Sequence, residues 1–317
     1  MMDRISVIIP VYNSEGSLVE LCDRLIKTLD AITDDFEIIM VEDCSQDRSW
    51  EVITKLAGEN PGIKGIQLFR NFGQHNALLC GIRCCRGDII VTIDDDLQHP
   101  PEEIPKLLDE LSKGFDVVYG TPLQEQHGIF RDMASRLTKL VLQAAMKSEA
   151  ARNVSAFRAF RSPVKNAFVG YHNPFVLIDV LLTWGTTRFS SVEVSHEPRR
   201  DGVSNYSFSK LIIHAINMMT GFSTLPLQLS SYIGFFFTLF GIGVLFYVIG
   251  RYFIEGGSVP GFPFLASVIA IFSGAQLFAL GIIGEYLARM HFRSMGRPSH
   301  VVRNTVGLDD TKEDVTQ

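Results

Sequence analysis

Short β-branched runs alternate with longer amphipathic segments through about the first 120 residues. The runs have the length and residue types of strands and lie at 5–11, 36–41, 65–69, 88–93 and 116–119. The segments between them repeat apolar residues at helical spacing, at 15–30, 49–59, 74–85 and 101–112. Regular alternation of strand and helix predicts an α/β domain with a mainly parallel, Rossmann-like sheet covered by helices.

A different pattern occupies the C-terminal part. Residues 229–250 and 262–284 contain no charged side chain, and each stretch is long enough to cross about 30 Å of hydrocarbon. A pair of buried helices in a soluble core is the alternative, but two such stretches would overfill a domain of this size. The short linker between them contains Gly and Pro, which predicts a transmembrane helical hairpin.

The charges around this hairpin predict its orientation. The linker carries one Arg and one Glu, whereas the outer flanks are basic. The basic flanking residues are Arg199, Arg200, Lys210, Arg289, Arg293 and Arg297. Because cytoplasmic flanks carry the excess of Lys and Arg, both termini and the α/β domain are expected in the cytosol.

Overall charge and cysteine usage narrow the classes of function. The 317 residues carry a net charge of −6 and the sequence pI is near 5.8. A nucleic-acid partner is not expected, because such partners select for a basic surface. The five cysteines show neither a paired framework nor a metal-ligand spacing, which suits a reducing compartment. Residues 1–13 run into a strand pattern, so no signal peptide is expected.

Four of the predicted strands run into polar sequences, which read PVYNSEG, VEDCSQD, FRNFGQHN and IDDDLQHPPE. In open α/β sheets, ligands bind beyond the carboxyl ends of the strands. Each loop alone is compatible with ordinary turn and helix-cap chemistry. Four such loops at one edge of a sheet predict a binding crevice.

The acidic run Asp94, Asp95 and Asp96 directly follows an apolar strand, where mutual repulsion requires a cation or a solvated turn. A hard divalent ion, held by one or two carboxylates and by substrate phosphates, would relieve the repulsion. Along an extended chain Asp94 and Asp96 point one way and Asp95 the other. The alternative is a helix N-terminus, which explains Glu102 and Glu103 but not the three aspartates.

The ordered motifs SVIIPVYN, VEDCSQD, RNFGQHNA and DDDLQHPPE, followed by two apolar stretches, resemble a known family. The family is the inverting family 2 glycosyltransferases with a GT-A fold. Within it, the resemblance is strongest to the polyprenyl-phosphate glycosyltransferases, the group of dolichol-phosphate mannose synthase and bactoprenol glucosyltransferase. The resemblance covers most of the chain and implies a GT-A catalytic domain with a C-terminal two-helix transmembrane hairpin.

This resemblance implies roles for the matching residues. Asp94 and Asp96 would hold Mg²⁺ or Mn²⁺ and, with Arg131, would be catalytic. The acceptor phosphate would be bound by Arg131, Arg136 and Arg158. The nucleotide-sugar would be bound by Pro10, Tyr12, Asn13, Glu15, Asp43, Asn71, Gln74, Asp95, Gln98, Arg200 and Lys210. Turn and cap chemistry is the alternative at the first loops, above all for Glu15, whose charge suits a helix N-terminus.

One motif departs from the family pattern. Glu42 and Cys44 stand where Asp and Gly are commoner, which leaves the backbone turn of that loop open.

Two further segments, 130–144 and 208–222, have an apolar helical face with cations off it, as helices in the headgroup layer do. Packing on the protein's own sheet is the alternative. The predicted organisation is a cytosolic domain at 1–206, an interfacial helix and linker at 207–228, two transmembrane helices at 229–288 and a cytosolic tail at 289–317. A short strand in the tail suggests, as a hypothesis, pairing between subunits of a homo-oligomer.

The function implied by the resemblance is inverting transfer of a hexose, glucose foremost, from a UDP-sugar to polyprenyl (undecaprenyl) phosphate at the cytosolic face of a bacterial plasma membrane. GDP-mannose, UDP-N-acetylglucosamine and UDP-aminoarabinose are alternative donors. A noncatalytic membrane scaffold or transport-associated protein is an alternative of another class. A phosphate acceptor is largely anionic near pH 7, so a strong general base is not required.

Two related classes fit less well. A processive polysaccharide synthase would carry a Gln-x-x-Arg-Trp motif, and neither Trp50 nor Trp184 lies in one. A dinucleotide oxidoreductase would carry G-x-G-x-x-G after the first strand, and that pattern is not present there.

Overall fold

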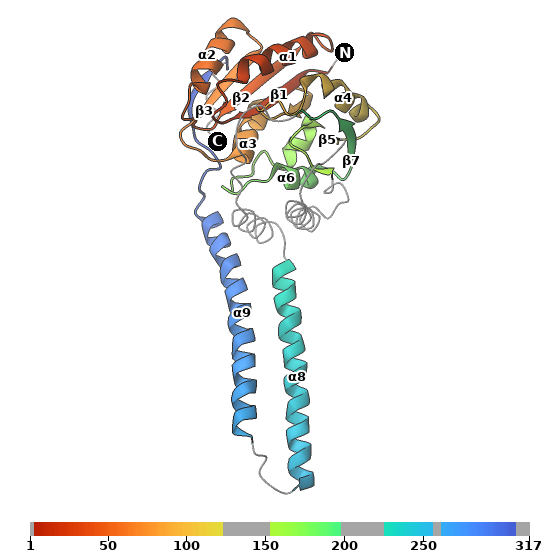
Figure 1. Cartoon of the computed structure of the whole chain (residues 1–317), viewed down its shortest axis with the longest axis vertical. Coiled ribbons are helices and arrows are strands. Elements are labelled where there is room, and N and C mark those ends of the chain that lie inside the picture. Colours follow the sequence, from red (N-terminus) through yellow and green to blue (C-terminus); the bar gives the residue numbers. More distant parts are fainter. Residues whose placement is uncertain (1–2, 123–152, 198–224, 256–260, 309–317) are drawn as a thin grey trace. The chain divides into compact units, whose positions relative to one another are not determined.

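The computed structural model describes residues 3–122, 153–197, 225–255 and 261–308. The chain divides into two compact units, one formed by Met1–Phe208 with Gly296–Gln317 and the other by Ser209–Met295. The first unit is a β-sheet between helices, and the second is built from two long helices (Figure 1).

The N-terminal part alternates strand and helix as the sequence pattern predicts. Its strands are β1 (Ile5–Val11), β2 (Phe36–Glu42), β3 (Ile63–Leu68), β4 (Ile89–Thr92) and β5 (Val117–Pro122). Its helices are α1 (Leu18–Asp30), α2 (Ser49–Glu59), α3 (Gln74–Cys84), the 3₁₀ turn η1 (Pro101–Glu103) and α4 (Ile104–Ser112). The bounds of β1 and α2 match the prediction, whereas α1 begins three residues later than the predicted 15–30 because the preceding residues form a loop.

Eight strands of the described residues form one mixed sheet in the order β7-β5-β6-β4-β1-β2-β3-β8. The central strands β4, β1, β2 and β3 are parallel to their neighbours in this group. The strand β6 (Arg158–Arg161) runs antiparallel between β4 and β5, and β7 (Phe189–Val194) pairs with β5 in parallel. The mainly parallel α/β architecture expected from the sequence is confirmed.

Helices cover both faces of the sheet and create two cores. On one face, α1, α2 and α4 pack alternate residues such as Leu21, Ile53 and Leu107 against Val7 and Ile9 of β1. On the other face, α3 and α6 (Ile178–Gly185) pack against the intervening strand positions. The central strands are buried on both sides, which explains why they read as continuous apolar runs.

The segment 153–194 holds elements that the sequence pattern did not predict: β6, the 3₁₀ turn η3 (Ser162–Ala167), α6 and β7. They complete the sheet beyond β4. The short β6 has only four residues, and its apolar character is interrupted by Arg158 and Arg161 at its ends. A strand this short, with charged ends, gives little periodic signal.

The predicted tail strand is present as β8 (Val302–Val306), but its partner is β3 of the same chain and not another subunit. The two strands are antiparallel, with Gly65 opposite Val306. A Cβ atom at Gly65 would lie 2.5 Å from Ile53 Cγ2 and 2.7 Å from Val306 Cγ1, so the glycine allows α2 and β8 to pack at one point. Because β8 is the last strand of this sheet, pairing of the tail strand between subunits stays a hypothesis.

The second unit contains α8 (Leu225–Glu255) and α9 (Phe262–Ser294). Within them, Pro226–Ile254 and Ile271–Ser294 are long and apolar enough to cross a membrane. Their apolar side chains are exposed, among them Phe235, Phe246 and Leu277. A large exposed apolar surface of this kind is typical of a membrane-embedded helix and not of a helix in a soluble core.

Candidate active site

The loops that follow β1, β2, β3 and β4 meet at the carboxyl end of the sheet, because these strands run in parallel. Hydrogen bonds between the loops define the crevice. The Tyr12 N–H donates to Asp95 Oδ2 at 3.0 Å, the Phe72 N–H to Asp43 Oδ1 at 2.7 Å, and Gln74 Nε2 to Asp94 Oδ1 at 2.6 Å. The convergence expected from the four polar motifs is therefore present.

Asp95 joins the first and fourth loops. Its Oδ2 also accepts a hydrogen bond from Ser14 Oγ at 2.5 Å, and its carbonyl accepts one from Ser17 Oγ at 2.6 Å. Burial raises the pKa of Asp95, and the Ser14 and Tyr12 hydrogen bonds oppose the rise. Through Oδ2 the carboxylate holds the loop after β1, and its assignment as a ligand of the nucleotide-sugar stays a prediction.

The first and second loops are joined by reciprocal hydrogen bonds. The Asn13 N–H donates to Ser45 Oγ at 3.0 Å, and Asn13 Oδ1 accepts from the Gln46 N–H at 2.7 Å. The Glu15 N–H donates to Asp47 Oδ2 at 2.9 Å, and Glu15 Oε2 accepts from the Arg48 N–H at 2.8 Å.

These contacts make Asn13 and Glu15 organisers of the crevice wall. The turn and cap alternative weighed for Glu15 describes its role in this structure. Tyr12 stands 46% exposed beside them, so its ring is available to a ligand.

Asp43 fastens the loop after β3 to the end of β2. Its two oxygens accept the N–H groups of Phe72 and Gly73, each at 2.7 Å, and its side chain is almost fully buried. Burial raises the pKa of Asp43 to about 6 although both hydrogen bonds oppose the rise. In this arrangement Asp43 positions the N-terminus of α3, and the contact with uracil or ribose implied for it stays a prediction.

Within the part of the chain that the structure describes, three residues other than glycine adopt the left-handed conformation, and all follow strands that reach the crevice. They are Asn13 with φ of 54°, Cys44 with 59° and Leu97 with 59°. Residues with backbone in this sparsely populated region cluster at functional sites. Cys44 adopts the conformation for which glycine is preferred, so the turn that the departure from the family motif left open is retained here.

Asp94 lies at the floor of the crevice, partly buried and bonded to Gln74. Burial, followed by the charges of Asp96 and Asp95, raises the pKa of Asp94 to about 7, while Arg158 and Gln74 act in the opposite sense. Asp96 Oδ1 accepts the Gln98 N–H at 3.1 Å, which turns the chain after the acidic run. Asp94 is therefore an acid whose ionisation its surroundings disfavour.

A divalent cation fits this donor set. Among the described residues, no group of three or more His, Cys, Asp and Glu side chains is arranged to hold a metal by itself. Mg²⁺ commonly binds through one or two carboxylates together with substrate phosphates, and a site of that kind needs only Asp94 and Asp96 from the protein.

Arg158 was expected to bind the acceptor phosphate, and the structure corrects this. Its side chain is 1% exposed and pairs with Asp179, while Nε donates to Thr92 Oγ1 at 3.0 Å. The Tyr119 hydroxyl donates to the same Asp179 oxygen at 3.2 Å. Arg158 thus acts from within the sheet, where its charge counters that of Asp94. A buried arginine pairs with a buried acid because an unpaired charge would be very costly there.

The remaining predicted residues divide into three groups. Pro10 is buried within β1 and lines no surface. Asn71 is exposed in the loop after β3, and Gln98 is partly buried beside the acidic run. Arg131, Arg136, Arg200 and Lys210 lie outside the described residues, as do the segments 130–144 and 208–222.

The sequence did not single out the residues that attach the segment after β7 to the acidic loop. The Glu197 N–H donates to the Gln98 carbonyl at 2.8 Å, and the His196 ring lies 5.1 Å from that of His99. Burial and His196 lower the pKa of His99 to about 4, so this ring is neutral near pH 7. Arg24 donates to Glu102 and to Glu197. No periodic signal marks such contacts, because they join residues that are far apart in the sequence.

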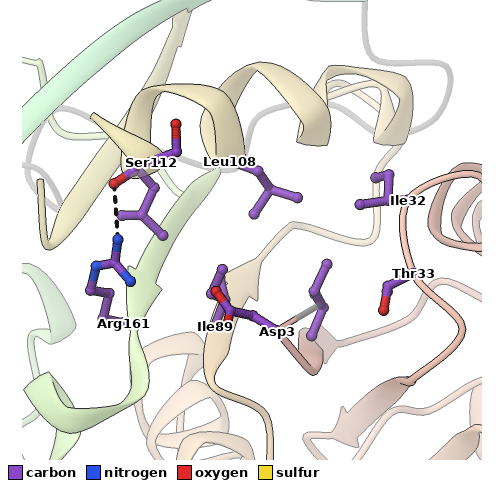
Figure 2. Close-up of a pocket in the computed structure, with 9 residues that line it drawn as sticks. Asp3, Ile32, Thr33, Ile89, Leu108, Ser112 and Arg161 are labelled. Atoms are coloured by element: carbon purple, nitrogen blue, oxygen red, sulfur yellow. Dashed lines mark hydrogen bonds between the residues drawn. The ribbon is translucent and has the colours of Figure 1, made fainter. Parts of the chain in front are cut away.

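A separate cavity of about 350 Å³ lies at the amino end of the strands, beside Ile5 and Ile89 (Figure 2). Its wall is mainly apolar, and Arg161 Nη2 donates to the Leu111 carbonyl at 3.2 Å. None of the residues predicted to bind substrate lines it.

An open α/β sheet with an acidic loop at its carboxyl end, together with the ordered motifs, defines the class of nucleotide-sugar glycosyltransferases. Residues 6–168 match the family described as glycosyl transferase family 2. The chain belongs to this family, and its enzymatic class, glycosyltransferase, is confirmed.

Two bacterial relatives align over nearly the whole chain. The undecaprenyl-phosphate 4-deoxy-4-formamido-L-arabinose transferase of Pectobacterium atrosepticum is 35% identical, over 95% of this chain and 93% of its own length. The protein of the same description from Photorhabdus laumondii is 34% identical, over 98% and 96%.

A solved structure shares the fold. Glucosyl-3-phosphoglycerate synthase from Mycobacterium tuberculosis, crystallised with phosphoglyceric acid, superposes with a TM-score of 0.51 at 20% identity. The match covers 69% of this chain and 78% of that chain.

Proposed function

We propose that this enzyme transfers a sugar from a UDP-sugar to undecaprenyl phosphate at the cytosolic face of a bacterial plasma membrane. The observation that supports the proposal is the crevice itself, in which Asp94 and Asp96 lie partly buried, and burial with the charges of the neighbouring acids raises the pKa of Asp94. The acceptor is inferred from the relatives, which are described as undecaprenyl-phosphate transferases and align over the α/β domain and both apolar helices.

The sugar is proposed to be a 4-deoxy-4-amino-arabinose derivative, of which the 4-formamido form is the first candidate. This replaces glucose, the hexose expected first from the sequence. Two relatives aligned over at least 93% of their length carry the formamido-arabinose description, and UDP-aminoarabinose was among the alternative donors. The excess of Lys and Arg on the outer flanks of the hairpin supports the cytosolic placement of the crevice.

The chain's own residues position the reactants. Gln74 holds Asp94 by a hydrogen bond, and Asp95 and Asp43 fix the loops on either side. Tyr12, exposed at the rim, is placed to contact the nucleotide base. The oxygen of a phosphate monoester is a sufficient nucleophile near pH 7, so the protein needs to orient it behind the anomeric carbon and not to remove a proton. One in-line displacement then inverts that centre.

Asp94 and Asp96 would hold Mg²⁺ or Mn²⁺ with the diphosphate of the donor, and the bound ion would stabilise the negative charge of the leaving nucleoside diphosphate. Arg131, Arg136, Arg200 and Lys210 remain proposed phosphate ligands on the basis of the family motif alone.

The test uses the purified full-length chain in detergent or nanodiscs with undecaprenyl phosphate and Mg²⁺ or Mn²⁺. Radiolabelled UDP-4-deoxy-4-formamido-L-arabinose, UDP-glucose, UDP-N-acetylglucosamine and GDP-mannose are compared as donors. We expect lipid-linked product from the arabinose donor at a rate at least about tenfold above the others, as expected where buried polar groups select the substrate. Product from UDP-glucose alone would contradict the choice of sugar, and lack of product from every donor would favour the noncatalytic alternative.

A further inference from the structure

The surface formed by η3, the loop that follows it and the end of α6 combines exposed aromatic and apolar side chains. Trp184 is 51% exposed at the end of α6, and Val169 is 38% exposed in the loop. The ring of Tyr171 packs edge-on against that of Trp184, with 5.5 Å between centroids. We call Val169, Tyr171, His172 and Trp184 the aromatic seat. A tryptophan and a tyrosine paired at a surface are typical of groups that lie at the level of lipid headgroups.

The chain around this seat has a charge opposite to that of the whole protein. The net charge of the chain is −6, yet residues 162–178, 180–192 and 295–304 contain no Asp or Glu. The same stretches contain Lys165, His172, Arg188, Arg297 and Arg303. Asp179, which separates the first two stretches, is neutralised in the buried pair with Arg158. Asp116 and Glu110 of neighbouring elements accept hydrogen bonds from Thr186 and Ser190 of these stretches, so both signs of charge are present there. The cations of the stretches are complementary to anionic lipids.

Arg83 ties the seat to the residues that follow the second apolar helix. Its Nε donates to the Val169 carbonyl at 2.8 Å and its Nη2 to the Tyr171 carbonyl at 2.6 Å, while Nη1 donates to Ser299 Oγ at 3.3 Å. The apolar stretch Ile271–Ser294 ends five residues before Ser299. Five residues of extended chain span at most about 18 Å, so this covalent link keeps Ser299 within that length of Ser294.

We propose that the aromatic seat rests in the headgroup layer of an anionic bilayer and holds the catalytic unit at the membrane surface. Its occupant is lipid, because the seat joins exposed aromatic rings, a cationic surround and a short covalent tether to a membrane-spanning segment. A seat of this kind would keep the crevice close to an acceptor whose phosphate lies in the same layer. The inference rests on the proposed location of α8 and α9 in a membrane, and it does not depend on the sugar or on transfer.

The chain offers its own reporter, since it has only two tryptophans. Trp50 packs against the core on the face of the sheet that α1, α2 and α4 cover, whereas α6 with Trp184 lies on the opposite face. The Trp50→Phe variant leaves Trp184 as the sole tryptophan, and the Trp184→Phe variant leaves Trp50 as a matched control. Both are prepared as full-length protein at one chain per nanodisc, with phosphatidylglycerol and brominated phosphatidylcholine.

We expect brominated lipid to quench Trp184 fluorescence at least about threefold more than that of Trp50, because bromine quenches only rings at or near the bilayer. If Trp50→Phe does not fold, the difference between the wild type and Trp184→Phe gives the same quantity. Replacing phosphatidylglycerol by a zwitterionic lipid is expected to reduce the quenching of Trp184. Equal quenching with the two lipids would contradict the electrostatic part of the proposal.

Equal quenching of the two tryptophans would overturn the proposal. It would also be overturned if Trp184 were protected from acrylamide without being quenched by brominated lipid, because protein, such as a second copy of the chain, would then cover it. Transfer activity is measured on the same samples. Quenching without any sugar transfer would contradict the proposed function alone, and transfer without quenching would contradict the aromatic seat alone.

Discussion

Two groups of buried acids lie at opposite ends of one sheet, and the protein neutralises only one of them. At the amino end, Glu37 accepts hydrogen bonds from Lys64 Nζ and Ser6 Oγ, each at 2.5 Å, and from the Arg86 N–H at 2.6 Å. Burial opposes the ionisation of Glu37, but these partners outweigh it and lower the pKa of the carboxyl. At the carboxyl end, burial and two neighbouring acids raise the pKa of Asp94 to about 7.

The difference separates a structural acid from a functional one. Glu37 is fully paired and gains nothing from a further ligand, so it contributes to folding. Asp94 and Asp96 are held in place by Gln74 and by the turn at Gln98, and burial with the neighbouring acids raises the pKa of Asp94. Perturbed acids in a crevice, with an excess of like charge, are candidates for ligand binding. The following experiments test that separation.

The largest effect is expected for Asp96→Asn, which removes one of the two proposed metal ligands. Transfer should fall by at least about 10³-fold, the upper range for loss of a group that stabilises charge in a transition state. Thermal stability should not fall, because the substitution removes repulsion from the acidic run. Product formation and melting temperature are measured on the same preparation.

The matched control is Asp109→Asn, the same chemical change at an exposed position of α4. It should leave transfer unchanged. Wild-type activity in Asp96→Asn would remove the acidic run from the mechanism and with it the contrast between the two ends.

At the amino end, Lys64→Met should lower stability and spare activity. The substitution keeps the apolar stem but leaves Glu37, which is 1% exposed, without its nearest cation and with only Arg4 at 4.0 Å. Breaking a buried pair from one side costs about 3–5 kcal/mol in the free energy of unfolding. Denaturant unfolding of the α/β unit in the full chain measures the loss, with transfer rate per folded enzyme as the second readout.

The double variant Glu37→Gln with Lys64→Met removes both charges and should recover much of the lost stability. A Lys64→Met variant as stable as the wild type would show that the burial of ionised Glu37 does not depend on Lys64.

The pair of Glu37 and Lys64 also predicts that the free energy of unfolding depends on pH. The folded pKa of Glu37 lies below its ordinary value of 4.5, so its stabilisation is fully present above that value. It is lost as the pH falls through the lowered folded pKa, where the paired carboxylate takes up a proton. The stability difference between the wild type and Glu37→Gln should therefore be constant from pH 8 down to about pH 5 and shrink below it. A difference that grows as the pH falls would have the wrong sign.

A smaller effect on catalysis is expected for Gln74→Ala, which removes the hydrogen bond to Asp94. A hydrogen bond to a charged group contributes about 1.5–3 kcal/mol, so kcat/KM should fall by about 10- to 150-fold. Gln46→Ala is the control, because the contact of Gln46 with Asn13 is made by its backbone N–H and survives the substitution. Equal losses in the two variants would indicate a general effect on the loops instead of a specific one on Asp94.

The sequence allowed the alternating elements and the convergence of the loops to be predicted, because both follow from local pattern and from the geometry of parallel strands. It did not reveal which carboxylates are already used. Asp95 reaches Tyr12 and Asp43 reaches Gly73 over long separations along the chain, and Arg158 finds Asp179 only once β6 has inserted beside β4. These partners depend on the packed sheet, so no local motif distinguishes a binding acid from one that holds a loop.

The smallest effect concerns Cys44, which replaces the commoner glycine at the end of β2. Its φ of 59° places a non-glycine residue in the left-handed region, at a cost of about 1–2 kcal/mol relative to glycine before other contacts are counted. Cys44→Gly should therefore raise the free energy of unfolding by up to about 1 kcal/mol, with the loss of its weak Sγ contact to the Phe69 carbonyl as the opposing contribution.

The matched variant is Gly73→Ala in the neighbouring loop, where φ is 94° and a Cβ atom would meet no other atom within 4 Å. Backbone strain by itself should lower the free energy of unfolding by about 1 kcal/mol or more. The substitution should also disturb the hydrogen bond that the Gly73 N–H donates to Asp43. A higher free energy of unfolding for Cys44→Gly and a lower one for Gly73→Ala would show that the turns lining the crevice adopt backbone conformations that are strained for residues other than glycine. A loss of stability in Cys44→Gly would instead assign Cys44 a packing role that outweighs its strain.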